Sequence, residues 1–247
     1  MKLRFTLIAA VLLFAAASLF TSCKTANVAA HYSSKYINAN NGKLNAQVPE
    51  TFELGYAMLA LTNIAQNDTA IVDKNTAYYQ ELITFLGKHE NHKGVLRLNA
   101  ELSRNPKMIK SYLDGLYAFK MNDNRFALKE SYRIDLNKID FKRYSLLLQS
   151  FYKETNFHEF YMNHQAQYAQ MIKNANAMYS FDEAQKTLNV KVKSYQVILS
   201  PLTKGYAGTM EIKGRSYSEY IIFPRTTTST TSAAIRYAVN DNKSAAE

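Results

Sequence analysis

The sequence predicts an α+β protein, in which an N-terminal region of several helices is followed by a small β-sheet. Between residues 49 and 190, apolar side chains recur at the three- and four-residue spacing of one helix face. After residue 190, short apolar runs bounded by Pro and Gly replace that spacing, which is typical of buried strands. We expect both regions to belong to one domain.

The first 22 residues have the organisation of a secretion signal. Lys2 and Arg4 form a positive start, and residues 5–20 are apolar except for Thr6 and Ser18. This apolar run is shorter than the roughly 20 residues that a membrane-spanning helix needs. The sequence therefore predicts a cleaved signal peptide over residues 1–22.

The one cysteine of the chain, Cys23, follows the small residues Thr21 and Ser22 at the expected cleavage point. This arrangement resembles the lipobox of bacterial lipoproteins, whose cysteine is lipidated and becomes the new N-terminus, although Phe20 stands where Leu is usual. The resemblance implies lipidation of Cys23. Because Lys24 and not Asp follows it, the resemblance also implies an outer-membrane lipoprotein that faces the periplasm. The alternative is an ordinary signal peptide, with Cys23 incidental.

The charge of the chain bears on its partners. Removing Lys2 and Arg4 with the signal leaves 28 of the 30 basic residues against 20 acidic ones, a net charge of about +8. The lysines are scattered, with no dense basic run and no recognition motif, so we expect no nucleic-acid partner. The charge instead indicates a solvated surface beside anionic lipid.

Residues 23–48 are predicted to be a lipidated tether. From residue 25 onward this segment is rich in Asn, Ala, Ser and Lys and keeps no regular period. Such a composition is typical of a linker that holds a domain away from a membrane.

The helical region is predicted over residues 49–190. Pro49 and Glu50 open its first helix, which places Phe52, Tyr56 and Leu59 on one face. Further helices are expected after residue 75, over about 93–103, from 105–106 through 119, and from 140. Residues 122–124 interrupt the pattern, and residues 125–133 are ambiguous and fit an extended link.

The strongest helical pattern covers residues 156–179, where one apolar stripe runs along a helix face. Asn156 and Glu159 fit a capping box at its start, which predicts that the Asn156 backbone amide donates a hydrogen bond to the Glu159 carboxylate. Ser180 and Glu183 fit a second capping box, at the start of a short helix that follows.

Two pairs of histidines raise the question of a metal site. His158, Glu159 and His164 look like half of a zinc-peptidase motif, but that motif places its histidines four residues apart. A spacing of six separates the two rings by about 120° on a helix, so we expect no metal there and a packing role for His164. His89 and His92 are three residues apart in a link, where no third ligand is evident and solvated side chains are expected.

The β region is predicted over residues 191–240 and a polar tail over 241–247. Strands are expected at residues 195–199, 209–212 and 216–223, each ended by Pro or Gly. Residues 226–232, a run of Thr and Ser, are expected to form a loop, and residues 233–239 to start another element. No arrangement of Ser, His and Asp can be argued from this run.

Three stretches together resemble a known family. They are VPETFELGYAMLALTN at residues 48–63, NFHEFYMNHQAQY at 156–168, and YQVILSPLTKGYAG at 195–208. They are similar to the domain-of-unknown-function family 4932, bacterial proteins that look like gluzincin-type zinc peptidases. The family's helical half, strands and following zinc helix imply the same architecture here. The zinc helix is missing, because no His occurs after His164, so no catalytic or metal-binding residue is carried over.

Two hypotheses of function follow. The chain is either the N-terminal portion of a zinc peptidase-like protein, inactive as it stands, or a non-catalytic periplasmic module that binds a peptide or protein. The first implies no cofactor in this chain, with zinc bound only if a longer chain carries the missing motif. It also predicts that the gene continues past Glu247 into a zinc helix.

Overall fold

The structure is a computed structural model that describes residues 30–129, 141–204 and 208–224. Ten helices, one four-stranded sheet and one two-stranded hairpin lie within these residues, so the α+β prediction is confirmed. Cys23 lies outside the described residues, as do the predicted signal peptide, the Thr- and Ser-rich loop, the element at 233–239 and the tail. Among the described helices, none is both long enough and apolar enough to cross a membrane.

The four-stranded sheet has the order β1-β4-β6-β5. Its strands are β1 (Lys43–Gln47), β4 (Ser194–Ile198), β5 (Gly208–Lys213) and β6 (Ser218–Phe223). β1, β4 and β6 are parallel to one another, and β5 runs antiparallel to β6. The three strands predicted after residue 190 are thus confirmed as β4, β5 and β6.

The predicted tether is wrong over its second half. Residues Ser34–Asn40 form helix α2, and β1 completes the sheet beside β4. Ala30 already contacts the sheet region, because its amide donates a hydrogen bond to the Lys213 carbonyl. The sequence did not predict this strand because its residues are mostly polar. Such a composition is possible because β1 is an edge strand whose outward positions face solvent.

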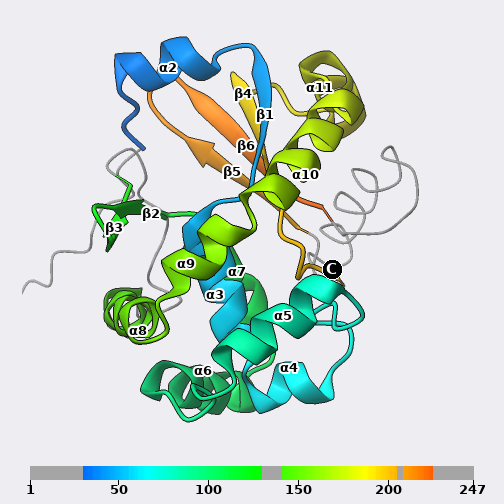
Figure 1. Cartoon of the computed structure of the whole chain (residues 1–247). Coiled ribbons are helices and arrows are strands. Elements are labelled where there is room, and N and C mark those ends of the chain that lie inside the picture. The colour runs from blue at the N-terminus through cyan, green and yellow to red at the C-terminus, as the bar shows by residue number, and fades with distance from the viewer. Residues whose placement is uncertain (1–29, 130–140, 205–207, 225–247) are drawn as a thin grey trace, which may run out of the picture.

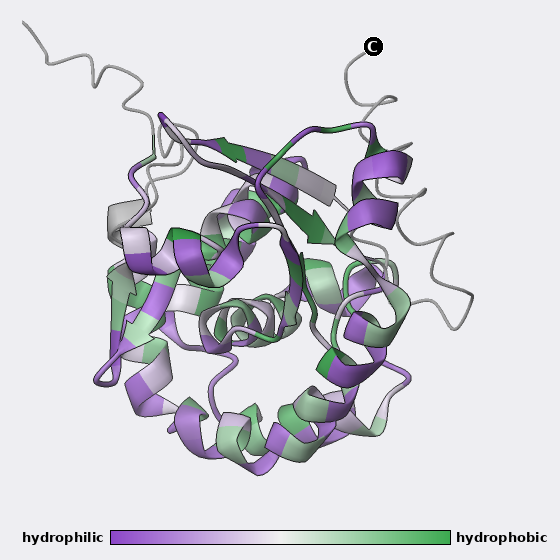
Figure 2. Cartoon of the chain, turned by 90° about the horizontal axis from the view of Figure 1, so that it is seen from above, coloured by the Kyte–Doolittle hydropathy of each residue, from purple (hydrophilic) through white to green (hydrophobic). Residues whose placement is uncertain are grey.

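The helical region supplies six helices before residue 155. They are α3 (Glu50–Ala60), α4 (Asn63–Asn67), α5 (Ala77–Leu86), α6 (Lys93–Arg104), α7 (Met108–Leu116) and α8 (Phe141–Glu154). They lie below the sheet in Figure 1, with α4 and α6 farthest from α2. The outer helices alternate between hydrophilic and hydrophobic residues along their length (Figure 2), as amphipathic helices do.

A β-hairpin interrupts this region where the sequence predicted a longer helix and a link. The helix from residue 106 ends at Leu116, and Phe119 belongs to strand β2 (Phe119–Asn122), which pairs with β3 (Arg125–Leu128). Asp123 and Asn124 have φ values of 47° and 60°. Positive φ at both central residues is typical of a type I′ hairpin turn, and Asp and Asn adopt it readily.

The helix predicted over residues 156–179 is two helices, α9 (Phe157–Asn163) and α10 (Gln165–Met178). The break is at His164, whose amide bonds to the Tyr161 carbonyl and not to that of Phe160. The His164 ring takes over the Phe160 carbonyl at 2.7 Å, and the Gln165 side chain bonds the Tyr161 carbonyl at 3.0 Å. Side chains therefore satisfy the carbonyls that a continuous helix would have used.

The two capping predictions have different outcomes. Asn156 adopts a left-handed conformation with φ 52°, and its side-chain amide donates to the Glu159 carboxylate at 2.6 Å, so the box predicted there is wrong. At α11 (Phe181–Leu188), the Ser180 hydroxyl accepts from the Glu183 amide, which confirms the predicted cap.

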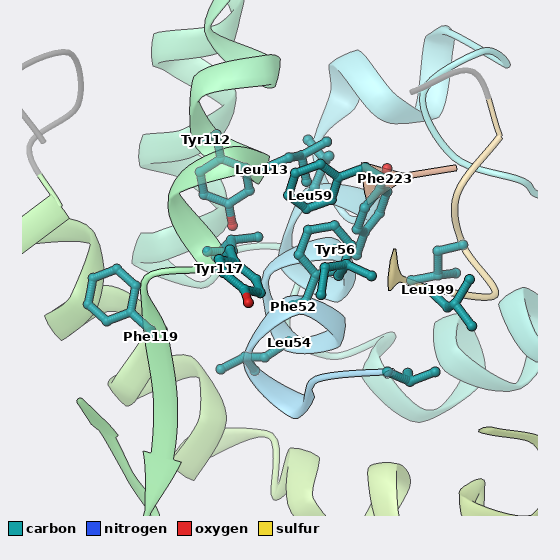
Figure 3. Packing of buried hydrophobic residues seen from close by; sticks show 14 of the residues in the cluster. Phe52, Leu54, Tyr56, Leu59, Tyr112, Leu113, Tyr117, Phe119, Leu199 and Phe223 are labelled. Carbon is teal, nitrogen blue, oxygen red and sulfur yellow. The ribbon is translucent and has the colours of Figure 1, made fainter. Parts of the chain in front are cut away.

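Helix α3 lies at the centre of the core. Ten of its eleven residues are buried, so the predicted inward face of Phe52, Tyr56 and Leu59 is only part of what it covers. These side chains lie among Tyr112 and Leu113 of α7 and Phe223 of β6 (Figure 3). Gly55 permits α7 to approach, because an added Cβ would overlap the Leu116 side chain. Such close packing on all sides explains why this helix has only a weakly polar face.

Candidate functional site

His158 is held by a carboxylate of a distant helix. Its Nδ1 lies 2.8 Å from Oε1 of Glu50, which also accepts a hydrogen bond from the Tyr152 hydroxyl at 3.2 Å. The His158 side chain is half exposed, whereas Glu50 is 13% exposed. This pair joins α9 to α3.

His164 confirms the packing role predicted for it. Its side chain is 13% exposed, and its ring lies 4.8 Å from that of Tyr78 and 4.2 Å from that of Phe160. Nδ1 donates to the Phe160 carbonyl, and Nε2 lies 2.9 Å from the Glu81 carboxylate. These contacts hold the junction of α9 and α10 against α5.

Of the two histidines in the link after α5, His92 is not the solvated side chain that was predicted. The His92 side chain is only 5% exposed, and it caps α6 by accepting from the Gly94 amide at Nδ1. Its Nε2 therefore carries the proton and lies 3.3 Å from the Ser150 hydroxyl of α8. The sequence signal for this role was the position of His92 directly before an amphipathic helix.

These contacts bear on the metal question. His158 pairs with Glu50, His164 with Glu81 and His92 with Glu154, so each of these three histidines is paired with a carboxylate from a different helix. Within residues 30–129, 141–204 and 208–224, no group of three or more His, Cys, Asp or Glu side chains is placed to hold a metal ion.

A buried carboxylate that sequence reasoning missed lies in the middle of α3. Glu53 is fully buried, and the Tyr78 hydroxyl donates to its Oε2 at 2.7 Å. Tyr78 has a single hydroxyl proton, so the Tyr168 hydroxyl, 2.6 Å away, must be the donor between the two tyrosines. The chain Tyr168–Tyr78–Glu53 thus joins α10, α5 and α3.

Burial sets the protonation of this network. It raises the pKa of Glu53 to about 7, although the hydroxyls of Ser200 and Tyr78 oppose it by stabilising the carboxylate. Burial also raises the pKa of Tyr78 and Tyr168 well above their ordinary range, and the Glu53 charge raises them further. Glu53 is therefore the group in this network that exchanges a proton near neutral pH. The signal in the sequence was a single acidic residue inside the apolar run from residue 52 to 61.

A second buried carboxylate, Glu219, lies in β6 beneath α2. The Tyr36 hydroxyl donates to its Oε2 at 2.6 Å, and the Tyr117 hydroxyl lies 3.5 Å from its Oε1. Lys129 lies over the Tyr117 ring, with Nζ 3.6 Å from the ring centroid. Burial lowers the pKa of Lys129 to about 7, while the Glu219 charge raises it. Because Tyr36 belongs to α2 and Tyr117 follows α7, this cluster fastens α2 onto the sheet.

In comparisons with known proteins, no protein-family model, curated protein or solved structure matches the chain.

Proposed function

We propose that this protein is a lipoprotein of the bacterial cell envelope, anchored in the outer membrane through Cys23 and facing the periplasm. Its folded domain is a non-catalytic module that binds a peptide or protein. The positive start, the apolar run and the lipobox-like residues before Cys23 support the anchor. A diacylglycerol group and an amide-linked acyl chain on one cysteine would supply the several chains that stable anchoring needs.

The pairing of the histidines carries the non-catalytic part of the proposal. His92, His158 and His164 each bond a carboxylate of another helix, and they do so at three separate places. Side chains that would be the first candidates for acid–base or metal chemistry thus stabilise the contacts between helices.

The anchor is tested by replacing Cys23→Ala in the full chain and fractionating the cells. We expect the wild type in the outer-membrane fraction and the variant either unprocessed or free in the soluble envelope fraction. Metabolic labelling with a palmitate analogue provides a second measurement, since the label should be lost with Cys23. Quantitative outer-membrane association of a processed, unlabelled variant contradicts lipid anchoring.

The resemblance to gluzincin-type peptidases supports the second candidate, the N-terminal part of a peptidase-like protein that would bind zinc only through a motif outside this chain. The two are separated by reading the genomic DNA downstream of codon 247 and weighing the native protein, because only the second candidate requires a zinc helix after Glu247. The assignment of the histidines is tested by adding zinc, dialysing, and measuring the metal by mass spectrometry. We expect less than one zinc per chain and no cleavage of an unfolded protein substrate. One tightly bound zinc that disappears in both His158→Ala and His164→Ala would overturn our assignment of these histidines to packing.

A further inference from the structure

The folded domain begins very close to the proposed anchor. Ala30 is bonded to the end of β5 through the Lys213 carbonyl, and it forms a parallel bridge with Gly214. Only residues 24–29 separate it from Cys23. Even fully extended, the chain from Cys23 to Ala30 spans about 25 Å, so the domain cannot move far from the bilayer that holds the lipid. The anchor thereby decides which part of the domain is nearest the membrane.

That part is one end of the sheet. The parallel strands β1, β4 and β6 all begin there, and the antiparallel β5 ends there, as the pairings Lys43 with Ser194 and Lys213 with Ser218 show. Helix α2 lies at this same end, at the top of Figure 1. The Tyr32 hydroxyl, which bonds the Ile212 carbonyl, fastens the segment before α2 to it.

The side chains at this end are strongly basic. We define the basic rim as the exposed lysines and arginine of residues 30–44, 189–194 and 212–218, namely Lys35, Lys43, Lys191, Lys193, Lys213 and Arg215. These three segments contain no Asp or Glu. The nearest acidic residues along the strands are Glu219, which is buried, and Glu211, which pairs with Lys213 at 3.2 Å. The lysines that seem scattered in the sequence are thus gathered by strands from three distant segments.

We propose that the basic rim is a membrane-contact surface that binds the phosphate groups of anionic lipids in the bilayer carrying the anchor. This inference rests on the proposed lipidation of Cys23, because that anchor brings the rim to the bilayer. Basic side chains within about 8 Å of an anionic surface are attracted to it at physiological salt. The short connection holds the rim at a high effective concentration near the lipid, so weak individual contacts suffice. The domain is thereby oriented with α4 and α6 away from the membrane.

The test uses the mature polypeptide from residue 24, without lipid, because every described element lies after residue 29. Its sedimentation is measured with phosphatidylcholine vesicles that contain phosphatidylglycerol, and with vesicles of phosphatidylcholine alone. A rim variant carries Lys43→Gln, Lys193→Gln and Lys213→Gln. A matched variant carries Lys88→Gln, Lys93→Gln and Lys107→Gln, which are exposed lysines at the start of α6 and in the links on either side of it. Circular dichroism and thermal unfolding establish that both variants are folded.

We expect binding to the anionic vesicles that weakens in high salt. Each lysine near an anionic surface contributes about fivefold to affinity, so the rim variant should lose about 100-fold. The matched variant loses the same charge and should change less than about fivefold. Equal losses in the two variants, or wild-type binding that does not require phosphatidylglycerol, overturn the proposal. If the rim variant fails to fold, Lys35→Gln with Arg215→Gln replaces it and should lose about 25-fold.

Failure of this proposal is distinguishable from failure of the proposed function. Vesicle binding is measured without any lipid on the protein, whereas the anchor is judged from the fractionation and labelling of Cys23→Ala. If the protein is labelled and membrane-bound but its mature polypeptide does not bind anionic vesicles, it is a lipoprotein without a membrane-contact surface at the basic rim.

Discussion

Replacing Glu53→Gln is expected to stabilise the protein at alkaline pH, although it alters a hydrogen-bonded network in the core. Glu53 is fully buried, and its environment raises the pKa of its carboxyl group from 4.5 to about 7. Below pH 4.5 both the folded and the unfolded chain hold this proton. Between pH 4.5 and 7 the unfolded chain releases it while the folded chain retains it, so wild-type stability falls as the pH rises.

The size of this effect follows from the shift in pKa. Each unit corresponds to about 1.4 kcal/mol, so a change from 4.5 to about 7 costs the wild type about 3 kcal/mol above pH 7. Gln keeps an oxygen that accepts from the Tyr78 hydroxyl, and it has no proton to release. If the hydrogen bond between Tyr78 and the Gln side chain is weaker than the one to Glu53, the stability lost in this way does not depend on pH. The pH-dependent part of the difference therefore isolates the ionisation of Glu53.

The measurement is urea unfolding of the wild type and variant, followed by circular dichroism at several pH values from 4.5 to 8.5. The free-energy difference between the two should move by about 3 kcal/mol in favour of the variant across this range. Glu90→Gln, at an exposed residue of the link after α5, is the control and should show no such trend. A difference that stays constant with pH would refute the argument that burial governs this carboxylate.

Three further changes test the packing. Gly55→Ala should destabilise the protein by about 1–3 kcal/mol in urea unfolding, because the added methyl group overlaps the fully buried Leu116; an unchanged midpoint would contradict this close approach. Asn176→Ala should cost about 1 kcal/mol and speed hydrogen exchange at Ala46, whose amide donates to the Asn176 side chain at the sheet edge; unchanged exchange at that amide is the contrary result. Ser180→Ala should cost about 1 kcal/mol by removing the α11 cap, whereas Ser180→Asp should retain most of the stability.

Local patterns in the sequence determined much of the secondary structure. Apolar spacing and terminal residues predicted most of the helices, including the start of α11 after Ser180. Continuous apolar runs predicted β4 and β6. These features depend on residues close together in the chain, which is why they can be read without the fold.

The break at His164 could not be predicted from the sequence, because it depends on a contact with a distant helix. The apolar stripe continues through residues 156–179, but the ring of His164 is held between Glu81 and the Phe160 carbonyl. The partner on α5 is 83 residues away in the sequence. Local periodicity carries no information on such a contact.

The edge strand β1 and the buried carboxylates were decided by tertiary structure for the same reason. β1 has a polar composition and becomes a strand because β4 offers it a parallel partner. Glu53 and Glu219 are tolerated inside the core because tyrosines from other elements donate hydrogen bonds to them. The sequence alone predicted the secretion signal, and it contains the lipobox-like position of Cys23 and the basic charge. Only the folded sheet brought that charge together on the rim beside Ala30, because its strands come from segments more than 140 residues apart.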